Sequence, residues 1–185
     1  PGGIATRHLV DSGVVVSAGH SEARLADLDI AIEQGLSMFT HLGNGCPCDI
    51  KRHDNTITRV LSRADALKIS FIADGHHIPW FALRQYLSLV PESNIVIVSD
   101  AMQAAGVGPG TYRLADQTVI VDPDQSAWSE DRSHFAGSAT TLPMMMRLLI
   151  EQQMGTPMQV ERWCYRNPGA LLSRSTGRIE DAPAG

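Results

Sequence analysis

The sequence is poor in lysine and has no long apolar segment. Lys51 and Lys68 are its only lysines, and the net charge of -5 is spread without a basic block. Nucleic-acid binding requires cationic side chains clustered on one face, so we predict no nucleic-acid partner. No apolar run approaches the roughly 20 residues that span a bilayer, and no signal-peptide core follows the first residues. We therefore also predict no membrane partner.

Cysteine is scarce as well. The chain has three cysteines, which cannot all pair, and a single proline separates Cys46 from Cys48, too short a spacing for an easy disulfide. This usage favours a reducing, cytoplasmic setting. Cys46 and Cys48 could instead be soft metal ligands, although no second cysteine pair is present to complete a zinc site.

The bulk composition is that of a folded domain. Hydrophobic residues make up 43% and charged residues 19% of the 185 positions. Disordered and collagen-like classes are excluded, because a chain of this length and composition can bury a substantial core. We expect residues 1–185 to form a single domain.

Short apolar runs alternate with helical patterns along the chain. Near-continuous apolar runs are typical of strands covered on both faces, and they occur at residues 14–17, 38–40, 69–72, 95–98 and 134–136. Apolar residues at helical spacing predict helices over residues 21–35, 54–64, 80–90, 141–154 and 158–165, with another turn starting at Pro168. This order predicts an α/β fold with a parallel sheet. Residues 112–114 and 118–121 flank a polar turn and predict an inserted β-hairpin.

Polar clusters directly follow each predicted strand. They are Gly19-His20-Ser21, Thr40-His41-Leu42-Gly43-Asn44-Gly45, Ala73-Asp74-Gly75-His76-His77, Ser99-Asp100-Ala101 and Ala136-Gly137-Ser138. In a parallel β/α barrel the carboxyl ends of the strands meet on one face, which holds the active site. Four of the seven histidines would therefore share one pocket.

Each of these residues also has an ordinary structural interpretation. A single histidine after a strand is most often a loop residue, but His20 and His41 at equivalent ends of consecutive strands suit a zinc-like ion. Asp100 could cap the following segment, or it could be a third ligand or a general base. The pair His76-His77 could lie exposed on a loop, or an imidazole could polarise a carbonyl.

The five clusters together resemble the motifs of the N-acetylglucosamine-6-phosphate deacetylases, a family of the metal-dependent amidohydrolase superfamily. The similar series are G-H-S, T-H-L-x-N, I-A-D-G-x-H, S-D-A and A-G-S, in that order. The likeness extends to residues 175–179, which resemble the family's exit from its barrel. It implies part of a (β/α)8 TIM-type barrel, about five βα units corresponding to strands 4–8. The family's N-terminal strands and small β domain would be absent.

The resemblance also implies roles for individual residues. His20, His41 and Asp100 would be metal ligands, with Asp100 also the catalytic acid and base and His77 the residue that polarises the acetyl carbonyl. Zinc is the leading metal, with iron, manganese and cobalt as alternatives. The substrate would be an amino-sugar phosphate, bound in a homo-oligomer by further residues: Asn44, Gly45, Arg52, His77, Phe135, Ala136 and Gly137.

Two departures from the family pattern leave alternatives open. No residue here matches the metal-ligand Glu that ends the family's third barrel strand, so an inactive fragment is one alternative. Arg52 is followed by His53-Asp54-Asn55, where the family commonly has Glu-Pro-Gly. A related amidohydrolase acting on another N-acyl substrate is therefore the second alternative.

Overall fold

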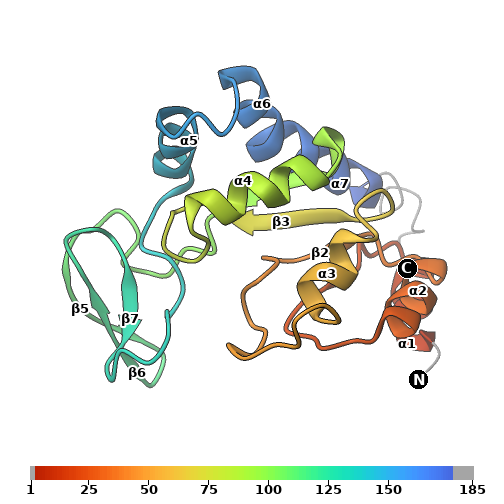
Figure 1. Ribbon diagram of the computed structural model, residues 1–185, viewed down its shortest axis with the longest axis horizontal. Helices are drawn as coiled ribbons and strands as arrows, with labels where there is room; N and C mark the ends of the chain where they lie inside the picture. Colours follow the sequence, from red (N-terminus) through yellow and green to blue (C-terminus); the bar gives the residue numbers. More distant parts are fainter. Residues whose placement is uncertain (1–2, 177–185) are drawn as a thin grey trace, which may run out of the picture.

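The computed structural model describes residues 3–176 and places two sheets at different positions in the molecule (Figure 1). Residues 177–179 of the predicted barrel exit lie outside this range. One sheet is parallel and belongs to the main core. The other is antiparallel and lies at the opposite end of the molecule from α1, α2 and α3.

The parallel sheet has the strand order β1-β2-β3-β4, with every neighbouring pair parallel. Its strands are β1 (Ser17–Ala18), β2 (Met38–Phe39), β3 (Lys68–Ile72) and β4 (Ile95–Val98). The connecting helices are α2 (Leu25–Glu33), α3 (Thr56–Leu61) and α4 (Trp80–Leu89), and a short 3-10 turn at Glu92–Asn94 leads into β4. The predicted parallel α/β class is confirmed.

Local sequence signals explain where these helices begin and end. Asn55 caps α3 with a reciprocal capping box, in which its side chain accepts from the Thr58 backbone and Thr58 accepts from the Asn55 backbone. Gly35 ends the segment after α2 with a φ of 100°, a conformation that favours glycine. The predicted helix starting at Ser21 begins later, because Ser21 Oγ accepts from the Ala23 amide in a turn before α2.

The core is centred on β3, and α4 runs alongside this strand in Figure 1. Ile69, Phe71 and Ile72 of β3 are completely buried. Helix α5 (Leu142–Glu151) adds Met145 and Leu149, which are also completely buried. The sequence runs that are apolar on both faces of a strand therefore lie in the most buried part of the core.

The last helical segment is hydrogen-bonded to the start of β4, at the edge of the parallel sheet. Helix α6 (Pro157–Glu161), a π-helical turn (Arg162–Arg166) and α7 (Asn167–Thr176) follow one another without a break. Buried Asn167 donates its Nδ2 protons to the Ile95 carbonyl at 2.6 Å and to the Glu92 carbonyl at 2.9 Å. These bonds hold the segment against the start of β4.

The antiparallel sheet is the predicted insertion, enlarged by one strand. It contains β5 (Gly110–Leu114), β6 (Gln117–Val121) and β7 (Ala127–Ser129), in that order. The hairpin prediction is confirmed, whereas β7 was not predicted. A small core of its own, including Val119, Val121 and Met102, stabilises this sheet.

Two predictions about strands need correction. Residues 134–136 do not form a strand of the parallel sheet, because their backbone pairs with β7: Ser129 N donates to His134 O and Ala136 N to Ala127 O, both at 2.9 Å. The parallel position beside β4 is taken by Ser138, which forms an isolated bridge with Ala101. The first predicted strand, residues 14–17, is reduced to the short β1.

Helix α1 (Ile4–Asp11) was not predicted. None of its residues is buried, so this helix adds nothing to the main core. Four parallel strands and one bridge correspond to the five expected βα units, and the assignment to part of a (β/α)8 barrel remains a prediction. Within residues 3–176, no helix is both long and apolar enough to cross a bilayer.

Burial of β3 predicts a large difference between two phenylalanines. Phe71 is completely buried and Phe81 on α4 is 75% exposed. Phe71→Ala should lower the free energy of unfolding by about 3–5 kcal/mol, because it removes a buried ring and leaves a cavity. Phe81→Ala should change it by less than about 0.5 kcal/mol. Urea unfolding followed by circular dichroism measures both, and equal effects would contradict this core.

Candidate active site

Four ionisable residues occupy equivalent positions at the carboxyl end of the parallel sheet. His20, His41, Asp74 and Asp100 each lie two residues after the last residue of β1, β2, β3 and β4, respectively. Parallel pairing brings these positions to one edge of the sheet. His20, His41, His77 and Asp100 line one cavity of about 550 Å³ there. Three of the four histidines predicted to share a pocket therefore line this cavity, whereas His76 does not, and its Nε2 lies 2.9 Å from the Asp124 carbonyl.

The imidazoles of His20 and His41 point their Nε2 atoms at each other, 3.0 Å apart. The rings are perpendicular, with centroids 4.7 Å apart. The His41 backbone amide is fixed by the Ser70 hydroxyl of β3 at 2.7 Å, and the residue is 9% exposed. Two nitrogen lone-pair positions therefore converge on one point of the cavity.

The backbone is strained at three of these residues. The φ angles are 47° at His20, 31° at His41 and 47° at Asp100. Residues with a Cβ rarely adopt positive φ, and each such conformation costs on the order of 1–3 kcal/mol. All three side chains line the cavity.

Gly45 lies against the His20 ring. A Cβ at this position would come within 2.3 Å of His20 Nδ1, and the residue has a φ of 74°. Only glycine fits both requirements, because it has no Cβ and accepts positive φ without strain. Gly45 thus holds one side of the His20 imidazole.

His77 is oriented by a buried carboxylate. Its Nδ1 lies 2.7 Å from Asp74 Oδ2, and its ring contacts Phe135 with a centroid distance of 4.9 Å. Burial opposes ionisation of Asp74, but hydrogen bonds from the His77 side chain and from the His76 and His77 amides outweigh it, so the pKa of Asp74 is lowered. Asp74 is therefore ionised at neutral pH.

The two convergent histidines suit a divalent transition metal. A separation of 3.0 Å lets both Nε2 atoms bond one ion, since zinc–nitrogen bonds are about 2.0–2.1 Å long. Asp100 shares the cavity, yet the described residues contain no group of three or more His, Cys, Asp or Glu arranged to hold a metal. The residues present thus fit a histidine pair of a metal site, without a placed third ligand.

Most of the predicted substrate-binding residues line the same cavity. Asn44, Gly45, His77, Phe135 and Gly137 belong to its wall. The other two predicted contacts do not. Ala136 is buried, 7% exposed, in the small core of the antiparallel sheet. Arg52 is exposed on the segment before α3, and neither lysine nor arginine occurs in the cavity lining.

Several cavity residues were not predicted from the sequence. They are Gly43, Cys46, Cys48, Trp128, Ser133 and His134. Cys46 and Cys48 are free thiols, and Cys46 donates to the Gly43 carbonyl. Asp74 was noted in its motif but given no role; its place two residues beyond β3, shared with His41 and Asp100, is the signal that identifies it.

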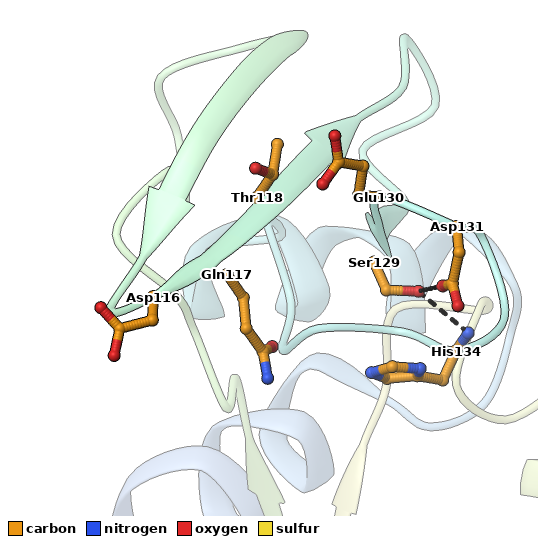
Figure 2. Close-up of a pocket in the computed structure, with 7 residues that line it drawn as sticks. All are labelled: Asp116, Gln117, Thr118, Ser129, Glu130, Asp131 and His134. Carbon is orange, nitrogen blue, oxygen red and sulfur yellow. Dashed lines mark hydrogen bonds between the residues drawn. The ribbon is translucent and has the colours of Figure 1, made fainter.

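A second cavity, of about 540 Å³, lies on the antiparallel sheet (Figure 2). One of its acidic residues is already hydrogen-bonded: Asp131 accepts from the Ser129 hydroxyl and from the amide and hydroxyl of Ser133. These bonds lower the pKa of Asp131 to about 2. The carboxylate stabilises the turn after β7. Among the residues that line this cavity, His134 is the single histidine (Figure 2).

Comparison with known proteins identifies relatives for this arrangement. The N-acetylglucosamine-6-phosphate deacetylase of Lysinibacillus sphaericus is 33% identical over 80% of this chain and 38% of its own length. The N-acetylgalactosamine-6-phosphate deacetylase of Escherichia coli O157:H7 is 29% identical over 91% of this chain and 44% of its own. No family model matches the sequence.

A solved structure extends the likeness to three dimensions. The D267A mutant of N-acetyl-D-glucosamine-6-phosphate deacetylase from Mycobacterium smegmatis, in complex with N-acetyl-D-glucosamine 6-phosphate, superposes with a TM-score of 0.81 at 25% identity. It covers 92% of this chain and 45% of that one.

The parallel sheet and its strand-end histidines thus occur in a chain that is similar to amino-sugar phosphate deacetylases. Within this group, the curated relatives and the solved structure most often carry the name N-acetylglucosamine-6-phosphate deacetylase, to which this chain is similar. The chain spans less than half the length of the curated relatives it matches.

The contact between Gly45 and His20 predicts a loss of metal affinity on substitution. Gly45→Ala should weaken Zn²⁺ binding by about 10- to 100-fold, the usual effect of disturbing groups that orient a metal ligand. Gly43→Ala is the matched control: it has a φ of 91°, but its Cβ would meet only Ile57, at 3.9 Å. Calorimetric titration with Zn²⁺ compares the two variants. Equal losses would mean that backbone strain, and not the His20 contact, is responsible.

Proposed function

We propose that this protein hydrolyses the acetamide of N-acetylglucosamine 6-phosphate, giving glucosamine 6-phosphate and acetate. The observation that carries the proposal is the convergence of His20 Nε2 and His41 Nε2 in the cavity that also contains His77 and Asp100. Kinship with the deacetylase family supports the same reaction.

His20 and His41 would hold a divalent metal ion, zinc first, with iron, manganese and cobalt as alternatives. When bound, the ion supplies Lewis-acid activation of water and of the acetyl carbonyl. Asp100, the third ligand implied by family resemblance, is exposed at the cavity wall. We assign the proton transfer to the Asp100 carboxylate.

Amide hydrolysis needs a base for the attacking water and an acid for the leaving amine. Asp100 accepts a proton as the water oxygen bonds to the carbonyl carbon, and returns it to the nitrogen as the carbon–nitrogen bond breaks. His77 donates a hydrogen bond to the carbonyl oxygen, where negative charge develops. Water is consumed, and the products are the free amine and acetate.

The sugar would occupy the part of the cavity next to the antiparallel sheet. Phe135, Gly137, Asn44 and Gly45 all belong to the cavity lining. Arg52 remains the proposed phosphate contact on family resemblance, and its exposed position before α3 requires the loop to bring it to the substrate. Homo-oligomer formation and a cytoplasmic location stay predictions.

A second candidate is deacetylation of a different N-acyl amino sugar. The lack of lysine and arginine in the cavity lining favours it, as does similarity to a relative named for N-acetylgalactosamine 6-phosphate. Comparing acetate release from the two 6-phosphates and from unphosphorylated N-acetylglucosamine separates the candidates. Equal rates with and without the phosphate would favour the second.

The proposal predicts that the Asp100 carboxylate is essential. Asp100→Asn should lower kcat by about 10²- to 10⁴-fold, because the amide cannot carry out the proton transfer. Acetate release from N-acetylglucosamine 6-phosphate in the presence of Zn²⁺ measures it. Asp116→Asn, at the turn between β5 and β6 and in the lining of the second cavity, is the matched control and should keep normal turnover.

Near-normal turnover by Asp100→Asn would contradict the assignment of Asp100 as the acid and base. A loss with Asp116→Asn instead would move the reaction to the second cavity. Absence of acetate release by the unaltered chain, with Zn²⁺ bound in the expected amount, would favour the inactive alternative.

A further inference from the structure

Asp74 has an unusually complete set of hydrogen bonds for a residue without an assigned role. Its side chain is 2% exposed. Oδ1 accepts from the backbone amides of His76 and His77, both at 2.9 Å. Oδ2 accepts from the Ser138 hydroxyl at 3.1 Å and lies 2.7 Å from His77 Nδ1. Residues 76 and 77 thus hold Oδ1, and His77 together with the distant Ser138 holds Oδ2.

The charge state of Asp74 decides which nitrogen of His77 carries a proton. An ionised carboxylate can only accept hydrogen bonds, so the proton between Asp74 and His77 must belong to Nδ1. Nε2, on the opposite edge of the ring, is left for the cavity that His77 lines. The His77 side chain is 8% exposed and its ring contacts Phe135, so there is little room for a different rotamer.

Ser138 links this pair to the strand end that holds Asp100. Its hydroxyl donates to Asp74 and accepts from the Thr140 amide at 3.1 Å. Its backbone amide donates to the Asp100 carbonyl at 3.0 Å, and its carbonyl accepts from the Met102 amide at 2.9 Å. A displacement of Ser138 would therefore move both His77 and Asp100.

We propose that Asp74 is a positioning residue that fixes His77 with Nδ1 protonated and Nε2 turned to the cavity, and that Ser138 holds Asp74 in place. The consequence for the reaction rests on the proposed function. With Nδ1 occupied, a neutral His77 offers only a lone pair at Nε2. It can donate to the acetyl oxygen only when Nε2 carries a proton as well.

The experiment measures, in the full chain, which ring nitrogens of His77 are protonated. With ¹⁵N-labelled histidine, heteronuclear NMR distinguishes protonated from unprotonated ring nitrogens, and His77→Phe assigns the signal. We expect a protonated Nδ1 in the unaltered chain. Asp74→Asn, which keeps the shape but removes the charge, should shift the His77 nitrogens toward the other tautomer or a mixture.

The matched control is Asn167→Ala. Asn167 is a buried polar residue at the opposite end of β4, so its loss destabilises the same sheet without touching His77. It should leave the His77 signals unchanged. If Asp74→Asn does not fold, Ser138→Ala removes a single hydrogen bond to the carboxylate and should cause a smaller shift in the same direction.

An unprotonated Nδ1 in the unaltered chain would overturn the proposal, as would His77 signals that neither variant changes. Kinetics provide a second reading: Asp74→Asn should lower kcat by about 10- to 100-fold and change KM less than about threefold. If the unaltered chain releases no acetate, the proposed function fails, whereas the tautomer measurement still decides the role of Asp74.

Discussion

Parallel pairing of β1 to β4 is the constraint on which the site depends. Because all four strands run in one direction, four residues far apart in the sequence reach the same edge of the sheet, each two positions beyond its strand. The strands themselves are short, and β1 and β2 contain only two residues each. Their alignment is maintained by the buried strand β3 and by hydrogen bonds such as that from the His41 amide to Ser70.

At the ends of β1, β2 and β4 the backbone adopts unfavourable conformations, which lower stability but fix the geometry of the site. Positive φ at His20, His41 and Asp100 is unfavourable for each residue, and nothing in the local sequence requires it. The surrounding core has to supply the compensating free energy. By contrast, Asp74 gains its orientation from hydrogen bonds, with no positive φ. The side chains of the site are thus oriented in two ways. His20, His41 and Asp100 follow strained backbone conformations, whereas Asp74 is held by buried hydrogen bonds.

Much of the fold could be predicted from the sequence, because β3, β4, α4 and α5 have apolar patterns that match their burial. The prediction failed where partners decide the structure. Phe135 lies in an apolar run, yet its neighbours pair with β7, which the sequence did not indicate. His20, His41 and Asp100 were found because each motif directly follows a strand. Asp74 has no role in the sequence prediction, because its burial and its hydrogen bond to Ser138, 64 positions away, are not visible in the local sequence. Arg52 was chosen by its spacing alone, and spacing does not determine where a loop residue points.

The direct bridge between Ala101 and Ser138 has a consequence for how this site can change. The two ends of the excursion through β5, β6 and β7 meet as neighbours in the parallel sheet, and the excursion has a small core of its own. Yet it contributes Trp128 and Phe135 to the cavity wall. The wall facing a ligand can therefore be lengthened, shortened or reshaped in residues 102–137 while the histidines on β1 and β2 keep their positions. Part of the cavity wall therefore lies on a different piece of the chain from the histidines of β1 and β2.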